Sequence, residues 1–273
     1  MNPPKADPSD SSAARGTEWP IFVLSLEGDE GRRAPLLNSL AEMGLDAEVL
    51  IGVDGRAGLP DWAEAEVDRT VELTWDYRPA RYVTDGVLAC ALSHVCAYRK
   101  MINDGLPGAI IFEDDAIVGE PLRRFMAAEG YKTGEMVLLG HEDTWVRRFS
   151  ATPLCQGVVG HRLVASPVLT HGYSLSRKAA SYILARASPV RTRADWPCDI
   201  SRIESWAADP QIALQPAEQN AKSHLEEDRV ALRRKKNRDK RSSRYFSRAY
   251  WMRMLRKKIN LVTMRKWFCR RIA

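Results

Sequence analysis

The sequence predicts one large α/β domain, a sheet flanked by helices, followed by a basic C-terminal segment. Short apolar runs rich in β-branched residues recur along the chain, as expected for buried strands. The segments between these runs repeat their apolar residues at helical spacing. With 273 residues, of which 45% are hydrophobic, the chain is long enough to enclose a substantial core. Together these features indicate alternating strands and helices in one domain.

The first structured unit is predicted to be a strand, a helix and a second strand. Residues 20–26 form one apolar run, and residues 47–55 form another that closes on Asp54. The intervening apolar residues recur at helical spacing and end at a glycine: Leu36, Leu37, Leu40, Met43 and Gly44. Such a unit opens a nucleotide-binding sheet. Because the sequence has neither a GxGxxG loop nor a P-loop motif, a metal is the expected partner for the phosphates of a nucleotide.

Further strands and helices follow in alternation. The predicted elements are an irregular stretch with helical pieces at 56–85, an amphipathic helix at 85–105, a buried strand ending at Phe112, a helix at 120–130, a strand at 135–140, a strand at 168–175, a helix capped by Ser176, a polar turn at 193–200 and a short strand at 211–217.

Three consecutive carboxylates, Glu113, Asp114 and Asp115, follow the buried strand that ends at Phe112. The carboxyl ends of strands are where open α/β sheets bind ligands. Since side chains alternate along a strand, Glu113 and Asp115 should share one face and Asp114 should point away, unless the chain bends there. Neighbouring carboxylates repel each other, and a hard divalent cation such as manganese or magnesium compensates that charge. The alternative is a solvated acidic loop that caps the next helix.

The composition disfavours several other classes of protein. No apolar run approaches the roughly 20 residues that a membrane-spanning helix needs. Residues 1–18 are rich in Pro, Ser and Ala and have no apolar core, so they predict a disordered leader rather than a secretory signal. The cysteines are scattered without CxxC spacing, which suggests neither a zinc site nor a disulfide framework: Cys90, Cys96, Cys155, Cys198 and Cys269. A cytosolic protein is expected.

The net charge of +6 is distributed unevenly. Residues 229–273, the basic segment, contain eighteen Lys or Arg and one acid, Asp239, for a net charge of +17, so the first 228 residues carry −11. Several apolar residues of the basic segment share one side of a predicted helix: Trp251, Leu255, Ile259 and Val262. A basic amphipathic helix of this kind favours binding to an anionic membrane surface. Nucleic-acid binding is a less favoured alternative, and a solvated tail is another.

Four segments stand in a recognisable order: IFVLSLEGDEGRR at 21–33, LIGVDGR at 50–56, ACALSHVCAY at 89–98 and AIIFEDDA at 109–116. Together they resemble glycosyltransferase family 25, which includes bacterial lipooligosaccharide galactosyltransferases and relatives in collagen glycosylation. A later strand-and-helix segment followed by WPCD also fits, so the resemblance covers about residues 21–223.

The chain departs from the family pattern at two positions. Ser25 stands where the family often has asparagine, and Ala89 stands where a glycine is usual. Neither change removes a charged or metal-binding group, so the reaction class that the resemblance implies is retained.

The resemblance implies a GT-A-like fold and a nucleotide-sugar donor, typically UDP-galactose, used with manganese or magnesium. Glu113 and Asp115 would hold the metal like the DxD element of GT-A enzymes, with His171 or His224 as a third ligand and Asp114 on the ion, its water or the ribose. The implied contacts to the nucleotide are the main chain at Leu24, Ser25 and Leu26 and the side chains of Asp54 and Arg33, with Arg32 as an alternative to Arg33. The implied sugar pocket is lined by Ser93 and His94.

An inverting sugar transfer needs a carboxylate to take the proton of the acceptor hydroxyl. Asp199 is the predicted catalytic base, with Asp115 as the second catalytic carboxylate, and the competing candidates for the base are Glu142, Asp143 and Asp195. The predicted function is therefore transfer of a hexose from a UDP-sugar to a bacterial surface glycan, at the cytoplasmic face of the inner membrane. The alternatives are a metal-dependent phosphohydrolase and a membrane or nucleic-acid adaptor.

Overall fold

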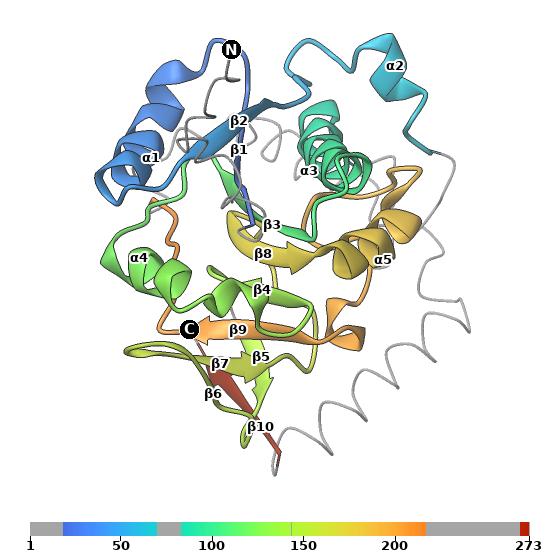
Figure 1. Ribbon diagram of the computed structural model, residues 1–273. Helices are drawn as coiled ribbons and strands as arrows, with labels where there is room; N and C mark the ends of the chain where they lie inside the picture. The colour runs from blue at the N-terminus through green and yellow to red at the C-terminus, as the bar shows by residue number, and fades with distance from the viewer. Residues whose placement is uncertain (1–18, 70–82, 143, 217–267, 273) are drawn as a thin grey trace, which may run out of the picture.

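The computed structural model describes residues 19–69, 83–142, 144–216 and 268–272 (Figure 1). Its centre is an eight-stranded mixed sheet with the order β2-β1-β3-β8-β4-β9-β7-β6. The strands of this sheet are β1 (Ile21–Ser25), β2 (Ala47–Ile51), β3 (Gly108–Glu113), β4 (Met136–Leu138), β6 (Thr152–Cys155), β7 (Val158–Arg162), β8 (Gly172–Ser176) and β9 (Ser205–Asp209).

Helices flank this sheet and a small second sheet completes the fold. The helices are α1 (Glu30–Glu42), α2 (Asp61–Glu64), α3 (Asp85–Asn103), α4 (Glu120–Ala127) and α5 (Arg177–Ala187), with 3-10 turns η3 (Gly130–Lys132) and η4 (Ile200–Arg202). The second sheet pairs β5 (Thr144–Arg147) with β10 (Cys269–Ile272) in antiparallel fashion. The predicted α/β sheet flanked by helices is confirmed.

The strand directions bring several chain segments to one edge of the large sheet. β1 lies between β2 and β3 and runs parallel to both, with Leu24 in register with Glu113. β8 runs antiparallel between β3 and β4, and its first residue, Gly172, lies opposite Phe112. The residues just before β8 therefore meet the carboxyl ends of β1, β3 and β4. This is the edge at which open sheets bind ligands.

Two apolar cores fill the space between the sheet and its helices. Ile110 and Phe112 of β3 face the core that contains Leu36 of α1 and Phe125 of α4. Ile111 of β3, between them in the sequence, faces the opposite core, which contains residues of α3 and α5. Because strand side chains alternate, one short run of fully buried residues supplies both cores. The result is a three-layer arrangement with α1 and α4 on one face and α3 and α5 on the other (Figure 1).

Two predicted strands need correction. The strand expected at 168–175 begins only at Gly172, because Leu169 has a φ of 77° and Val168 forms an isolated bridge to Glu142. The stretch 211–216 contains no strand, although Ile212 donates its backbone N–H to the carbonyl of Leu139. The strand in this region is β9, which ends at Asp209 and was not predicted. Strands β5, β6 and β7 were not predicted either.

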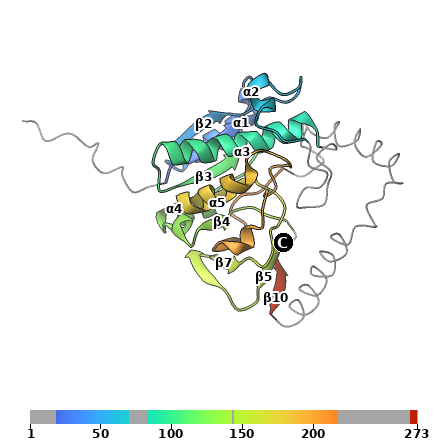
Figure 2. The ribbon, with the colours of Figure 1, turned by 90° about the vertical axis from the view of Figure 1, so that its right-hand side faces the viewer.

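The end of the basic segment also differs from the prediction. A helix was expected there, whereas residues 269–272 form β10 and pair with β5 (Figure 2). Cys269 and Ile272 are buried, so this strand belongs to the folded body. Residues 1–18 and 229–267, to which the disordered leader and the amphipathic helix were assigned, lie outside the described residues. None of the helices within the described ranges has the length and apolarity needed to span a membrane.

Candidate active site

The acidic triplet lies at the edge where β1 and β3 end. β3 stops at Glu113, and the backbone N–H of Ala116 donates to the Glu113 carbonyl at 3.1 Å, which closes a turn. Because of this turn, strand alternation does not govern the two aspartates. Asp114 and Asp115 both contact Arg32 of α1, while Glu113 is directed toward α3.

Asp114 is held by two side chains. Its Oδ1 accepts from Arg32 Nε at 2.6 Å and its Oδ2 accepts from Ser25 Oγ at 2.9 Å. The Asp114 side chain is only 9% exposed, so these contacts replace most of its hydration. This acid therefore links the end of β3 to the end of β1 and to α1.

Asp115 has one paired oxygen and one unpaired oxygen. Arg32 Nη2 donates to its Oδ2 at 2.7 Å, whereas its buried Oδ1 has no hydrogen-bond partner among the described residues. Burial, and after it the negative charge of Glu113, raises the pKa of Asp115, and the charge of Arg32 opposes that rise. A buried carboxylate oxygen without a partner is an available ligand for a cation.

Glu113 occupies a different environment. Its Oε1 accepts from Thr170 Oγ1 at 2.6 Å and lies 3.4 Å from His94 Nε2. Burial disfavours ionisation of Glu113, but the adjacent His94, the hydrogen bond from Thr170 and the nearby charge of His171 lower its pKa to about 2. Glu113 is thus ionised across the physiological pH range.

His171 lies beside Glu113 and Asp115. It directly precedes β8, and its carbonyl accepts from the backbone N–H of Glu113 at 3.1 Å. His171 Nε2 lies 3.1 Å from the carbonyl oxygen of Ala213, and its buried Nδ1 has no hydrogen-bond partner within the described part of the chain. The ring also packs against Gly140, where an added Cβ would lie 1.9 Å from Nε2. The predicted metal residues Glu113, Asp115 and His171 therefore occupy one sheet edge.

His94 is fixed from the side of α3. Its Nδ1 lies 2.7 Å from the hydroxyl of Tyr173, which in turn lies 2.8 Å from the hydroxyl of Tyr98. His94 is 2% exposed and both tyrosines are buried. This chain of buried polar groups orients the imidazole so that its other nitrogen faces Glu113.

The predicted nucleotide contacts lie around the ends of β1 and β2. Arg33 Nη1 donates to the carbonyl of Leu26 at 3.1 Å and to Ser25 Oγ at 3.3 Å. The half-exposed Asp54 binds the side chain of Arg56. The Arg33 guanidinium thereby fixes the main chain at the end of β1, while the Asp54 side chain remains accessible to solvent.

Ser93 has a structural contact that the sequence did not reveal. Its Oγ accepts from the backbone N–H of Val53 at 2.8 Å and donates to the carbonyl of Ala89 at 2.9 Å. A Cβ added at Gly52 would lie 2.8 Å from the same Oγ. Ser93 therefore fixes the segment that follows β2 against α3.

Two of the candidate bases, Asp195 and Asp199, lie in the loop between α5 and η4, whereas Glu142 lies between β4 and β5. Asp199 caps η4, where its Oδ1 accepts from the backbone N–H of Ser201 at 3.1 Å. Asp195 Oδ1 accepts from the backbone N–H of Leu169 at 3.1 Å, and Asp195 pairs with Arg193. Glu142 forms an isolated bridge with Val168. Asp143 and His224 lie outside the described residues.

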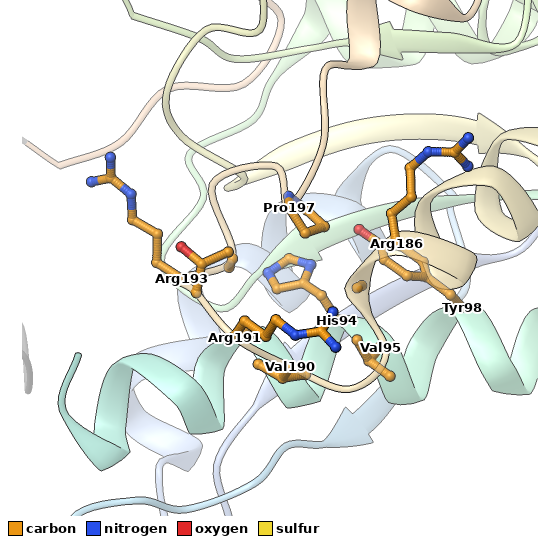
Figure 3. A pocket seen from close by; sticks show the side chains of 12 residues that line it. His94, Val95, Tyr98, Arg186, Val190, Arg191, Arg193 and Pro197 are labelled. Carbon is orange, nitrogen blue, oxygen red and sulfur yellow. The ribbon is translucent and has the colours of Figure 1, made fainter. Parts of the chain in front are cut away.

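A pocket of about 200 Å³ lies between α3, α5 and the loop that contains Asp195. In Figure 3, the His94 ring projects from α3 toward the loop at Arg193 and Pro197, and Arg186 of α5 lies at the other side. The pocket therefore adjoins the buried histidine that faces Glu113.

Comparison with known proteins agrees with this arrangement. The family model described as glycosyltransferase family 25 (LPS biosynthesis protein) matches residues 18–200. The chain belongs to glycosyltransferase family 25. The match includes the triplet, His94 and His171, and it ends just beyond Asp199.

Individual relatives of this family 25 chain differ in coverage. The lacto-N-neotetraose biosynthesis glycosyltransferase LgtB of Neisseria meningitidis serogroup B is 25% identical over 80% of this chain and 86% of its own length. The probable inactive glycosyltransferase 25 family member 3 of Rattus norvegicus is 32% identical over 38% of this chain, which spans only 18% of that protein. A putative glycosyltransferase of Haemophilus influenzae is 24% identical over 60% of this chain and 56% of its own length.

The fold is consistent with the GT-A-like arrangement expected of family 25, in that a mixed sheet is covered by helices on both faces. Among solved structures, A197 from STIV overlays on 74% of this chain and 87% of that chain, with a TM-score of 0.38 and 10% identity. A likeness of this size decides nothing about function.

Three residues of the site were missed by sequence reasoning. Thr170 donates to Glu113, Tyr173 holds His94, and Cys90 lies near both Glu113 and His94. Of these three, only Cys90 could have been found from the sequence, because it lies one helical turn before His94. Thr170 and Tyr173 become neighbours of the acids through the antiparallel pairing of β8 with β3, which the sequence does not disclose.

Proposed function

We propose that this family 25 chain is a metal-dependent glycosyltransferase that transfers a hexose, galactose in the first instance, from a UDP-sugar to a hydroxyl of a bacterial surface glycan with inversion. The observation that carries the proposal is the grouping of Glu113, Asp115 and His171 at the carboxyl ends of β1 and β3 in a member of this family. The charge of Glu113 raises the pKa of Asp115, and the charge of His171 lowers the pKa of both acids.

The residues at this edge fit a hard divalent cation. Asp115 Oδ1 and His171 Nδ1 are buried and make no hydrogen bond among the described residues. Two carboxylates and an imidazole are suitable ligands for manganese or magnesium. When bound, such a cation would stabilise the negative charge of a nucleoside diphosphate leaving group.

The protein's own groups would position the donor. Main-chain groups at Leu24, Ser25 and Leu26 lie at the end of β1, next to the acids, and Arg33 braces them through the Leu26 carbonyl. Asp54 at the rim offers an acceptor for a ribose or base. The predicted sugar-pocket role of His94 is compatible with its position on α3 beside Glu113, whereas the hydroxyl of Ser93 is engaged by the backbone of Val53 and Ala89.

The donor and acceptor are suggested by the names of relatives. LgtB of Neisseria meningitidis is named for lacto-N-neotetraose biosynthesis, and a human relative is named procollagen galactosyltransferase 2. The human protein is 29% identical over 35% of this chain, which spans 15% of it. These names favour UDP-galactose as the donor and a glycan hydroxyl as the acceptor of this chain.

The proposed base is Asp199, with Asp195 as the competing residue. Asp199 is half-exposed, as a group that receives an acceptor must be, but its oxygens are already engaged by Ser166, Ser201 and Arg202. Asp195 is linked to the acids through the chain, because it accepts from the backbone N–H of Leu169, next to Thr170, which donates to Glu113. Asn substitution at each position, with kcat measured at saturating donor, distinguishes them: the base variant loses turnover and retains donor affinity.

The experiment for the whole proposal is UDP release from UDP-galactose by the full chain with manganese and a panel of oligosaccharide acceptors. Wild type should release UDP, chelation should stop the release, and Asp115→Asn should lower it on the order of 100-fold or more. The matched control is Asp104→Asn, which alters an exposed acid paired with Lys100. Absence of both binding and UDP release with every UDP-sugar tested would refute the proposal. Release of inorganic phosphate instead would favour a phosphohydrolase.

A membrane role is proposed for the basic segment. Its net charge of +17 favours an anionic surface, which would place the enzyme on the cytoplasmic face of the inner membrane beside a glycolipid acceptor. Co-sedimentation with anionic vesicles tests this, using variants in which Lys and Arg of residues 233–258 are replaced by Gln and β10 is left intact. Equal binding by wild type and these variants would rule out the anchor.

A further inference from the structure

A cysteine and a histidine of α3 face the first acid of the triplet. Cys90 and His94 are four residues apart within the helix, so their side chains lie on the same face, one turn apart. Glu113 ends the adjacent strand β3 on the side that faces α3. Cys90 Sγ, a ring nitrogen of His94 and a carboxylate oxygen of Glu113 all lie within 4.8 Å of one another.

We propose that Cys90, His94 and Glu113 form a binding site for a borderline-soft divalent cation of the zinc class. One thiol, one imidazole and one carboxylate are the ligand types that zinc takes from proteins, and two ligands four residues apart on a helix is a recurrent metal-binding spacing. Ligand atoms around tetrahedral zinc lie about 3.3 to 3.8 Å apart. His94 Nε2 and Glu113 Oε1, 3.4 Å apart, already have this spacing, and Cys90 Sγ lies within 4.8 Å of a ring nitrogen of His94 and of a carboxylate oxygen of Glu113.

His94 supplies the second observation that points to a ligand. Its Nε2 is buried, faces Glu113 and Cys90, and makes no hydrogen bond within the described ranges, although it lies 3.4 Å from Glu113 Oε1. The residue as a whole is 2% exposed. An imidazole nitrogen that is sealed from water and aimed at a carboxylate and a thiol is placed to bind a cation between them.

Neighbouring hydroxyl groups hold two of the three ligands, His94 and Glu113, in place. Tyr173 contacts His94 Nδ1 at 2.7 Å and is itself held by Tyr98 at 2.8 Å. Thr170 donates to Glu113 at 2.6 Å. Metal-binding histidines and carboxylates are generally oriented by such contacts to the atoms that do not bind the metal. With three protein ligands, the fourth coordination position would be left for water or another small ligand.

This site goes beyond the proposed transferase and overlaps the donor cation site only at Glu113. Glu113 is shared, but Cys90 and His94 approach it from α3, whereas Asp115 lies on the side of α1 with Arg32. Glu113 has two carboxylate oxygens, so one can bind a cation on the α3 side and the other a cation on the side of Asp115. A thiolate ligand favours zinc or cobalt at the α3 side, in contrast to the oxygen-rich donor site.

The test uses the reduced full chain with cobalt as a spectroscopic probe and zinc as the stabilising ion. Cobalt should produce a thiolate-to-cobalt charge-transfer band in the near ultraviolet. The band should disappear in Cys90→Ser and persist in Cys96→Ser, a matched control because Cys96 lies on the same helix outside the cluster. Zinc should raise the melting temperature of wild type and Cys96→Ser, but not that of Cys90→Ser.

Two further variants separate loss of zinc binding from a folding defect and from loss of the donor cation site. Tyr173→Phe keeps all three ligands and should weaken zinc affinity about 10-fold to 100-fold through loss of His94 orientation. Asp115→Asn should retain the cobalt band even if it abolishes manganese-dependent UDP binding. A band that survives in Cys90→Ser, or that is absent from wild type or from Asp115→Asn, would overturn the site.

Discussion

The guanidinium Nε of Arg32 lies 2.6 Å from Oδ1 of Asp114, and this ion pair holds the middle acid of the triplet against α1. Ser25 binds the other oxygen of the same carboxylate. Asp114 is therefore satisfied by the protein itself, whereas Asp115 keeps one buried oxygen without a partner among the described residues. Consecutive acids in the sequence thus have different physical roles.

Asp114→Asn should mainly destabilise the protein. The substitution leaves the partly buried Arg32 with a weakened partner, and breaking one side of a desolvated ion pair costs about 1 to 3 kcal/mol. Urea unfolding of the full chain measures the loss. Asp104→Asn, which affects an exposed pair with Lys100, should cost less than about 1 kcal/mol. Equal unfolding midpoints for the two variants would contradict a structural role for Asp114.

Manganese binding should weaken in acid at a higher pH than an ordinary aspartate would allow. A cation competes with the proton for Asp115, and the pKa of Asp115 is raised by burial and by the charge of Glu113. The positive charge of Arg32 opposes this rise. Arg32→Gln should therefore move the loss of manganese affinity to still higher pH, as titration calorimetry across a pH series can measure. A shift toward lower pH would be inconsistent with this electrostatic coupling.

Glu113 should contribute to stability at neutral pH and lose that contribution in acid. Its pKa is about 2 in the folded protein against an ordinary value of 4.5, so the folded state favours the ionised form. The contribution is present above about pH 4.5 and disappears as pH falls toward 2. Its size at neutral pH is on the order of 3 kcal/mol. Glu113→Gln should accordingly flatten the stability curve between these values, measured by urea unfolding at each pH.

Gly140→Ala should disturb His171. The added Cβ would lie 1.9 Å from His171 Nε2 and 2.6 Å from the Ala213 carbonyl oxygen, so the ring must move. We expect a loss of about 1 to 3 kcal/mol in stability, together with weaker manganese binding if His171 is a ligand. Gly119→Ala is the control, because an added Cβ there meets no atom within 4 Å. Unchanged melting temperature in Gly140→Ala would show that the packing around His171 is looser than described.

Much of the fold follows from apolar patterning, but the contacts of the site depend on pairing between distant strands. The buried run before Glu113 and the stripe on α3 are long and regular, so both elements were predicted. β5 (TWVR), β6 (TPLC), β7 (VVGHR) and β9 (SWAAD) mix polar or charged residues and a proline with their apolar residues, and β10 lies among cations, so no comparable pattern marks them. Alternation could not describe Asp115, because the chain turns after Glu113. The contact between Thr170 and Glu113 arises only from the antiparallel register of β8 with β3.

Ile272→Ala should destabilise the body although it lies next to the chain end. Ile272 is 6% exposed and packs in the core that also contains Val146 of β5. Truncation of a buried isoleucine costs about 2 kcal/mol or more. Phe268 is 64% exposed, so Phe268→Ala should have a smaller effect. Thermal unfolding of the two variants decides whether β10 is an integral strand, and a larger loss for Phe268→Ala would show that it is not.

The pairing of β10 with β5 gives residues 217–267 two points of attachment to the same body. A ligand or surface that binds this stretch is therefore connected to the domain by two tethers rather than by one, which limits how the domain can rotate above it. If the partner is a bilayer, the enzyme would meet its acceptor in a restricted range of orientations. Releasing one tether should leave attachment intact and loosen that orientation.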